Sequence, residues 1–572
     1  MRTNHLATRL RQFSRSAPLI ELGRRIVEEQ TFSFNGFPDV KIDLLADWTA
    51  NPVNNRSWQW NTASFNFMPA LLGYHQESSD ARALDFAIAA IESWRSARPK
   101  LRDYEFANHD HATALRAENS LYLMAHLVQE KLAPDARPGV RRLILQEAAR
   151  LSQEELYSEH TNHGIEQSRI LAFVAHAFPK VKSSAEWWRL ALSRLEKEMA
   201  FAFTPEGVHV ENSPAYHLFV CNAFLKAVYA LPVDQTAGLR KTVDDTMAKA
   251  MDFATHVIRP DGMLPIIGDT QLAPPTNCFW PYSGSRAFKG FVFAASKGEN
   301  GARPTRSVAA FPQSGYLIVR DRWGSSPRQF QTAFHLVMKC GWHSQYHRHD
   351  DDLNLTLYYG EDWLIDGGLH SYVEDDPVRR YLRSKWAHNV CVIDSGGDRW
   401  EFSPRRRVTS TLSVDTPVGD PVRAAGATSA YPGYRARRSL VANRKNRTFS
   451  VRDSIRPNSA DAGPVQFRSL WHVPADKDVY VRDGEALVVS RATGRAMQIQ
   501  SIGEPFDNVG LLDLPVGAGG AVYSTQANQL RPARIVSFDK HARELSSTLS
   551  FQFFPKAELT GWTPTVLEPS VR

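Results

Sequence analysis

The chain has 572 residues, of which 43% are hydrophobic and 23% charged, an ordinary globular balance with enough length for two or more domains. Its net charge of +7 suits a polyanionic partner, but the Lys and Arg residues are scattered and no nucleic-acid-binding motif is present. Composition therefore argues against a disordered or nucleic-acid-binding protein and leaves the partner open.

Cysteine usage and hydropathy bear on the cellular compartment in which the protein is expected. The four cysteines have no metal-ligand spacing and indicate no disulfide framework. No apolar run has the length of a signal peptide or of a membrane span, so we expect a cytoplasmic protein without membrane insertion. A periplasmic or secreted location stays open if a signal was removed, and the sequence does not indicate an oligomeric state.

Apolar residues recur at helical spacing from about residue 80 to 257. In 81–97, for example, Leu84, Ala87, Ile88 and Ile91 fall on one face. Prolines and glycines separate the successive helical stretches, and no fixed repeat period is visible. Such a series favours antiparallel helix pairs, the arrangement that an α/α toroid needs.

Two helical stretches begin with polar clusters. The sequence HTNHGIEQSR, residues 160–169, places Asn162 and His163 where a loop enters a helix, although an N-cap role for Thr161 or Asn162 is the alternative. The sequence ENSPAYHLFV, residues 211–220, places Tyr216 in a first helical turn that Pro214 suits. A buried tyrosine with a satisfied hydroxyl is the alternative there.

A Pro/Gly-rich connector occupies residues 258 to about 312, and the pattern beyond it changes to short strands with a turn about every ten residues. We therefore predict a multidomain α+β protein. Residues 1–305 form the helical domain, and residues 306–572 form a large antiparallel β-sandwich.

The stretch from Trp342 to Asp394 holds an unusual group of polar residues. Leu353, Leu355 and Leu357 alternate as in a strand, and the turn at Gly360 starts a second strand that ends at Asp366. If the strand extends back through HRH, then His347 and His349 share one face.

The same stretch predicts a metal site. A hairpin would bring Asp366 back near His349, and the next strand would deliver His388. Two imidazoles and one carboxylate are ligands that a zinc-type divalent ion takes. The alternative is a set of satisfied core or surface histidines.

This segment resembles the C-terminal signature of the heparinase II/III superfamily of polysaccharide lyases. The pattern is H-x-H-x-D-x-L, a strand ending in D-G-G, then R-R-Y-x-R-S and A-H-N-V. The resemblance implies an N-terminal α/α toroid, a C-terminal antiparallel β-sandwich, and β-elimination of uronic-acid-containing polysaccharides. The matching residues here are His347, His349, Asp351, Leu353, Asp366, Arg380, Tyr381, Arg383, Ser384, His388 and Asn389.

The helical clusters resemble the same family's groove motifs, which implies catalytic roles for Asn162, His163, Tyr216 and His347. Asn162, with His163, would neutralise the uronate carboxylate so that the adjacent proton can leave. His347, His163 or a deprotonated Tyr216 would take that proton, and Tyr216 would protonate the departing oxygen.

The resemblance also implies supporting roles. His349, Asp366 and His388 match a structural metal site, with Asp351 as a partner that orients an imidazole. Arg116 and His111, in HDHATALR, match a groove segment, and Arg116 would pair with a substrate carboxylate or sulfate. Tyr372 and Tyr381 are candidates for a further groove hydroxyl.

The leading prediction is thus a polysaccharide or oligosaccharide lyase acting on an anionic glycan. A glycoside hydrolase on the same helical fold would need two carboxylates, for which Glu166, Glu211 and Asp269 are candidates. A non-catalytic glycan-binding or assembly protein is the other alternative. Heparan sulfate, hyaluronan, alginate and bacterial capsular or exopolysaccharides all remain open as substrates.

Overall fold

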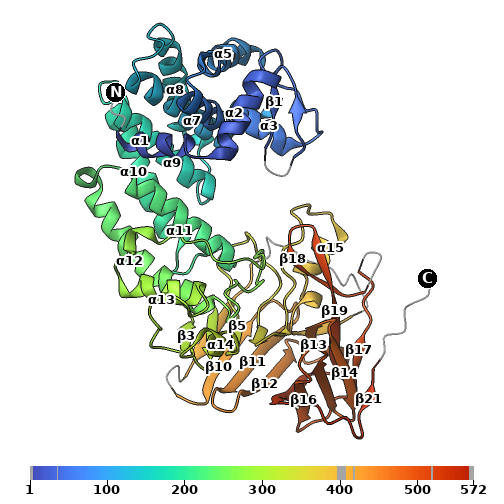
Figure 1. Ribbon diagram of the computed structural model, residues 1–572. Helices are drawn as coiled ribbons and strands as arrows, with labels where there is room; N and C mark the ends of the chain where they lie inside the picture. The colour runs from blue at the N-terminus through green and yellow to red at the C-terminus, as the bar shows by residue number, and fades with distance from the viewer. Residues whose placement is uncertain (1–3, 35–36, 396–406, 416–418, 517–519, 566–572) are drawn as a thin grey trace. The chain divides into compact units, whose positions relative to one another are not determined.

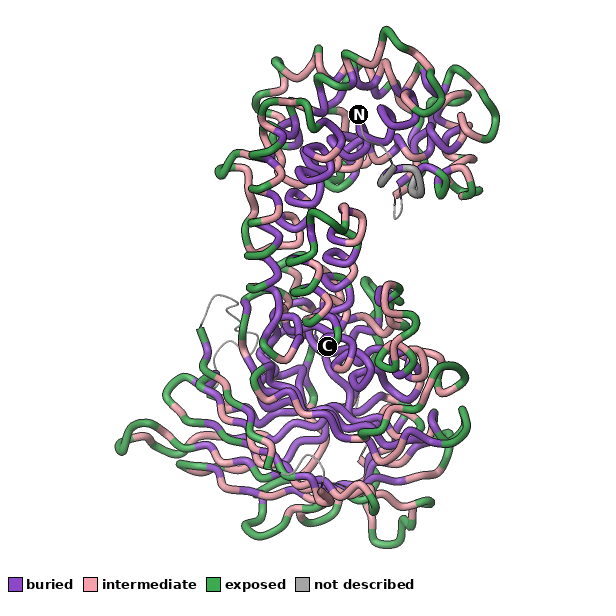
Figure 2. Tube along the Cα trace, turned by 90° about the vertical axis from the view of Figure 1, so that its left-hand side faces the viewer, coloured by how far each residue is buried: buried purple, intermediate pink, exposed green. Residues whose placement is uncertain are grey.

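The computed structural model describes residues 4–565 except 35–36, 396–406, 416–418 and 517–519. Contacts divide the chain into two compact units. The first, here called the helical unit, contains Met1–Phe201 and Ala223–Val243. The second, here called the sheet unit, contains Ala202–Asn222 and Asp244–Arg572. Each unit has its own buried interior (Figure 2).

The helical unit is built around one central helix, α7, whose residues from Arg116 to Leu127 are buried without interruption. Helices α4, α8 and α9 pack against α7, and α2 packs against α4. The helices in this part of the chain are α1 (Asn4–Phe13), α2 (Ala17–Glu29), α3 (Arg56–Ala63), α4 (Met68–Ser78), α5 (Ala81–Ala97), α6 (Glu105–Asn108), α7 (Asp110–Gln129), α8 (Arg137–Leu151), α9 (Asn162–Ala177) and α10 (Ser184–Ala202).

Two long helices contribute residues to both units: α11 (Pro214–Tyr229) and α12 (Val233–Val257). The last long run of helix is α13 (Arg286–Ala295), and the first strand of the sheet unit, β3 (Val308–Phe311), follows it (Figure 1). The change from helix to strand therefore falls in the predicted connector. The domain boundary near residue 305 stays a prediction, because the compact units divide the chain at other residues.

Three antiparallel sheets make up most of the sheet unit. A nine-stranded sheet has the order β21-β14-β15-β16-β20-β12-β11-β10-β9, and the five-stranded sheets have the orders β3-β4-β5-β6-β7 and β17-β19-β13-β8, with β18 paired to β19. The further strands are β4 (Tyr316–Arg320), β5 (Phe334–Lys339), β6 (Asn354–Tyr359), β7 (Asp362–Leu364), β8 (Cys391–Asp394), β9 (Ser410–Val414), β10 (Val422–Thr428), β11 (Tyr434–Asn443), β12 (Thr448–Pro457), β13 (Val465–Pro474), β14 (Lys477–Arg482), β15 (Glu485–Ser490), β16 (Ala496–Ile502), β17 (Asn508–Leu512), β18 (Val522–Gln526), β19 (Gln529–Ala542), β20 (Leu545–Phe554) and β21 (Thr563–Pro564).

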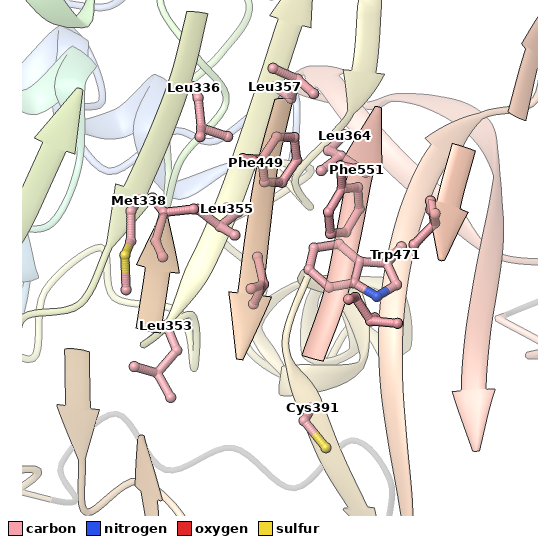
Figure 3. Close-up of a cluster of buried hydrophobic side chains, with 14 of the residues drawn as sticks. Leu336, Met338, Leu353, Leu355, Leu357, Leu364, Cys391, Phe449, Trp471 and Phe551 are labelled. Carbon is pink, nitrogen blue, oxygen red and sulfur yellow. The ribbon is translucent and has the colours of Figure 1, made fainter. Parts of the chain in front are cut away.

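One apolar core fills the space between the nine-stranded sheet and the other two (Figure 3). Leu353, Leu355 and Leu357 all belong to it, as their alternation predicted. On the facing sheet, the rings of Phe449 and Phe551 are stacked with their centroids 4.2 Å apart. Burying side chains of this size contributes roughly 1.5–3 kcal/mol each.

The predicted architecture of an N-terminal helical region followed by an antiparallel β-sandwich is confirmed. The predicted turn between the two strands of the histidine segment is also present, because Gly360 has a φ of +73° between β6 and β7. No helix in the described ranges combines the length and apolarity that a membrane crossing requires.

Candidate active site

The loop that carries His347 and His349 lies outside the sheets. Strand β6 begins only at Asn354, and His347 has a left-handed backbone with φ of +52°. The prediction that both histidines share a strand face is therefore wrong. A left-handed conformation is uncommon for a residue other than glycine, and it breaks the extended backbone that a strand requires.

Neighbouring segments hold this loop in place. The side-chain amide of Asn212 donates to the carbonyls of Ser344 (3.0 Å) and Tyr346 (3.1 Å). Gly268 also packs closely here, because a Cβ would lie 2.9 Å from the carbonyl oxygen of His347 and 2.6 Å from that of Asn212. Its φ of +55° also favours glycine. Close backbone packing therefore sets the position of His347.

Asp269 organises the histidines of the sheet unit. Its Oδ2 lies 3.0 Å from His347 Nδ1, and its Oδ1 lies 2.9 Å from His349 Nε2. The guanidinium of Arg379 spans both oxygens, with Nη2 donating to Oδ2 at 2.8 Å. Burial raises the pKa of Asp269, but these donors outweigh it and hold the pKa well below the usual range.

The ionised Asp269 fixes the tautomers of both rings. A carboxylate only accepts hydrogen bonds, so His347 carries its proton on Nδ1 and His349 carries its proton on Nε2. The Nε2 atom of a neutral His347 is then an acceptor. It lies 3.6 Å from Glu211 Oε2, and burial raises the pKa of Glu211.

Tyr216 lies in the first turn of α11, directly over His347. The two rings are stacked, with centroids 3.4 Å apart and an interplanar angle of 19°. The Tyr216 hydroxyl lies 2.8 Å from the hydroxyl of Tyr372, which is 56% exposed. Burial, followed by the neighbouring Tyr372, raises the pKa of Tyr216, so the phenol stays protonated at neutral pH. A proton donor and a proton acceptor thus lie side by side.

A second polar group of the sheet unit is fully buried. His388 Nδ1 is hydrogen-bonded to Asp366, which also accepts from the amide of Asn354 at 2.8 Å. The rings of His349 and His388 lie 5.4 Å apart. His349 Nδ1 and His388 Nε2 are buried and have no hydrogen-bond partner in the described structure.

These two ring nitrogens fit a metal ion. Buried imidazole nitrogens normally find a partner, and each of these two would present a lone pair in the neutral imidazole, because its other nitrogen donates to a carboxylate. In the described ranges, however, no three His, Cys, Asp or Glu side chains are already arranged as a metal site. Asp366 instead orients His388 directly.

The acidic run from Asp350 to Asp352 is buried and neutralised. Asp351 accepts from Lys339 Nζ at 2.6 Å, and Asp350 pairs with Arg348 at 3.0 Å and with Lys385. The prediction that Asp351 orients an imidazole is contradicted, since its bonded partner is Lys339. The run is not a solvated surface stretch either, because all three carboxylates are buried.

The helical unit contains its own histidine cluster, between the first turns of α7 and α9. His163 Nδ1 lies 2.9 Å from Asp110 Oδ2, and the rings of His163 and His111 are stacked 4.3 Å apart. Asp110 is also bonded to Ser158 and to His109. Burial raises its pKa, but the bonds from His109, His163 and Ser158 outweigh burial and lower it. Burial, followed by the nearby His163, lowers the pKa of His111 to about 3.

Local capping positions this cluster. Thr161 is the N-cap of α9, because its hydroxyl accepts from the backbone N–H of Gly164 at 3.2 Å. Asn162 and His163 are therefore the first helical residues, and both are half-buried. The Asn162 amide is not committed to the cap, which leaves it available to a ligand.

Two predicted substrate contacts are contradicted by burial. Arg116 is fully buried in α7, where it donates to the carbonyl of Ala63 at 2.7 Å and pairs with Glu147 at 3.3 Å. Tyr381 has no exposed surface either. Neither side chain reaches solvent, because each lies on the inward face of its helix. Tyr372 and His111 remain candidates.

Sequence reasoning missed the groups that position the histidines. The sequence suggests Asp269 only as a possible glycosidase carboxylate, and it indicates no role for Asp110 or Arg379. One signal was visible: Asp269 follows the apolar run LPIIG, where an acid needs a partner once buried. The partner itself is more than a hundred residues away in the sequence.

Family models match almost the whole chain. The model for the heparinase II/III N-terminus matches residues 12–282, and the model described as heparinase II/III-like, C-terminal, matches residues 303–552. A heparin-sulfate lyase from Bacteroides stercoris is 25% identical over 252 residues, which cover 42% of this chain and 36% of that protein. The match thus spans only about a third of that relative's length.

Solved structures share the fold. A heparinase III structure matches with a TM-score of 0.73 and 18% identity, covering 95% of this chain and 85% of that one. The structure of heparan sulfate lyase HepC from Pedobacter heparinus matches with a TM-score of 0.70 and 18% identity, covering 95% and 84%. With both family models matched along its length, the chain belongs to the heparinase II/III family.

Proposed function

We propose that the protein is a polysaccharide lyase that cleaves a uronic-acid-containing glycan by β-elimination. The observation that carries the proposal is the stacked pair of Tyr216 and His347, with Asp269 fixing the His347 tautomer. The relatives with curated names are heparin-sulfate lyases, which favours a sulfated glycosaminoglycan among the possible substrates.

In the proposed mechanism, His347 Nε2 removes the proton from the carbon next to the uronate carboxylate. Asp269 stabilises the imidazolium that forms, because its carboxylate already accepts from Nδ1. Tyr216, kept protonated by its raised pKa, donates to the departing glycosidic oxygen. The electrons of the broken C–H bond form the C=C bond as the C–O bond breaks.

The proton beside a carboxylate becomes acidic only when the carboxylate's charge is neutralised. Asn162 and His163 are the proposed donors for that purpose, because an amide and an imidazole can both donate to a carboxylate oxygen. The negative charge that develops during proton removal would then be stabilised.

We further propose one divalent ion of the zinc type, with a structural role, on His349, Asp366 and His388. The support is the pair of buried ring nitrogens without partners, with Asp366 at the other nitrogen of the His388 ring. When bound, such an ion would tie the His347 loop to the strand segments that carry Asp366 and His388.

The glycoside hydrolase alternative is weaker. It needs one carboxyl group that is protonated and a second that is ionised, flanking the scissile bond. Glu166 is paired with Arg169 at 2.9 Å, and Asp269 is held by Arg379 and two histidines. Burial raises the pKa of Glu211, but the group beside it is His347 rather than a second carboxylate.

The test is a panel of uronate polymers and oligomers followed by ultraviolet absorbance. A lyase produces an unsaturated uronide, so absorbance should rise with at least one polymer as its chains shorten. New reducing ends without absorbance would indicate hydrolysis instead. Binding of the polymers without cleavage would favour the non-catalytic alternative.

A further inference from the structure

The outer face of the nine-stranded sheet carries a group of exposed arginines on neighbouring strands. In β11, Ala436, Arg438, Leu440 and Ala442 are buried, and the residues between them point outward. Strand β12 alternates in the same way. We define the arginine face as the exposed side chains of Arg435 and Arg437 on β11 and of Arg452 and Arg456 on β12.

The strand register brings these cations together. Arg435 lies directly opposite Arg456, and Arg437 lies opposite Ser454, two residues along β12 from Arg452. Residues directly opposite in a sheet have Cβ atoms about 5 Å apart, and like charges in this position destabilise the sheet. Folding alone therefore does not account for this placement.

Acidic side chains do little to neutralise the arginine face. Residues 421–457 contain nine Lys and Arg residues and one acid, Asp453, which is buried and paired with the inward-facing Arg438 at 2.7 Å. Arg456 lies 3.5 Å from Glu544, but both side chains are more than half exposed, so this contact is weak. Arg452 donates to the hydroxyl of Ser546 at 3.2 Å.

The side chains between the arginines are short. The other outward positions of β11 and β12 are Ser439, Val441, Asn443, Thr448, Ser450 and Ser454. Small residues leave the guanidinium groups accessible, and the hydroxyls add hydrogen-bonding groups. None of these positions holds an aromatic ring on which a nucleic-acid base could stack.

We propose that the arginine face is a second binding surface, separate from the Tyr216–His347 pair, that holds the chain of a sulfated or uronate glycan. The proposal rests on the proposed function, which supplies an anionic polymer as the substrate class. Arginine binds carboxylate and sulfate groups through paired N–H donors. An exposed, extended sheet face matches a polymer with regularly spaced anions.

The test replaces Arg435, Arg437, Arg452 and Arg456 with Gln, in protein that also carries Tyr216→Phe so that no polymer is cut. Affinity for fluorescent heparin is measured at two salt concentrations. Each exposed ion pair contributes little, but the loss of four should weaken heparin binding about tenfold or more. This loss of affinity should be smaller at the higher salt concentration, because salt screens exposed charges. Melting temperature should stay the same or rise, because like-charge repulsion is removed.

A matched control removes the same charge elsewhere. Lys180, Lys182, Arg189 and Lys197 are exposed, and their replacement by Gln should change heparin affinity by less than about threefold. An equal loss in both variants would overturn the proposal, since net charge alone would then explain binding. So would an equal loss of affinity for double-stranded DNA, which would make the surface a general polyanion site. A double variant, Arg437→Gln with Arg452→Gln, provides the same comparison if the fourfold variant folds poorly.

Measurements of kcat and KM distinguish binding at the arginine face from catalysis at the Tyr216–His347 pair. With Tyr216 restored, the fourfold variant should keep its kcat on a short uronate oligosaccharide and show a raised KM on the long polymer. An equal change on both substrates would contradict a separate surface. If no uronate glycan is cleaved but heparin binding still depends on these arginines, the proposed function fails and the arginine face stands.

Discussion

Asp110 in the helical unit and Asp269 in the sheet unit each organise a group of histidines, but they differ in what balances their charge. Asp269 is paired with the guanidinium of Arg379, and its side chain is 2% exposed. Asp110 is bonded to His109, His163 and Ser158, and its side chain is 19% exposed. A buried carboxylate that is paired with a permanent cation holds its histidines in one arrangement. A partly exposed carboxylate that is bonded to imidazoles and a hydroxyl allows those groups to rearrange when a ligand binds.

This difference suggests a division of roles. The sheet unit holds His347 in one tautomer beside Tyr216, which suits proton transfer. The helical unit presents half-buried imidazole and amide donors, which suits recognition of a carboxylate. Four sets of substitutions test whether the two units divide the work in this way.

The largest expected effect is that of Tyr216→Phe on turnover. Removing a proton donor typically costs about 100-fold to 10,000-fold, and kcat should fall by that amount. Melting temperature should barely change, because the hydroxyl's bonded partner is the exposed Tyr372. Tyr372→Phe is the matched control and should lose less activity. Near-normal kcat in Tyr216→Phe would remove this phenol from the mechanism.

The second substitution compares the two carboxylates. Asp269→Asn leaves Arg379 as an unbalanced buried charge, which should lower the free energy of unfolding by about 3–5 kcal/mol. Asp110→Asn leaves imidazole and hydroxyl donors partly unsatisfied, which should cost about 1–3 kcal/mol. Urea denaturation of both variants measures the difference, with the exposed Asp85→Asn as the control. Equal losses would show that Arg379 does not distinguish the two sites.

The third substitution compares two histidines that share Asp269. His349→Ala should remove a ligand of the proposed ion and so lower both metal content and melting temperature, because an ion that binds only the folded state stabilises it. His347→Ala should keep the metal and lose most turnover. Elemental analysis and thermal denaturation of the two variants are the measurements. Loss of metal in His347→Ala alone would mean that the two roles must be exchanged.

The smallest expected effect concerns Arg116. Because Arg116 is buried beside Glu147, Arg116→Met should lower the free energy of unfolding by about 1–3 kcal/mol and leave KM unchanged. The loss is limited because Arg98 also pairs with Glu147, at 2.8 Å. The exposed Arg141→Met is the control. A raised KM with unchanged stability would restore Arg116 as a substrate contact.

Periodicity and motif spacing predicted the order of helices and strands well, because both depend on local patterns. The alternation of Leu353, Leu355 and Leu357 and the turn at Gly360 are examples. The same reasoning failed a few residues earlier, at His347 and His349. The polar residues there are compatible with a loop as well as with a strand. Backbone packing by Asn212 and Gly268 decides the conformation there, and neither is close in sequence.

Predictions of the candidate site depended on residue types and motif positions, which do not report burial. Arg116 and Tyr381 have the chemistry of substrate contacts, yet tertiary packing encloses both. Asp269, which bonds to His347, lies 78 residues from it in the sequence, and Arg379 lies 110 residues from the Asp269 that it holds. A single sequence gives no signal for such a pairing beyond an acid within an apolar run.

If this chain breaks a glycosidic bond by elimination, the mass of its products will show it. Each uronate polymer that shortens with the protein should be analysed by mass spectrometry, with Tyr216→Phe as the inactive control. Elimination predicts a new non-reducing end that is lighter by one water molecule than a hydrolytic product. Products that carry the full mass of the added water would contradict the account.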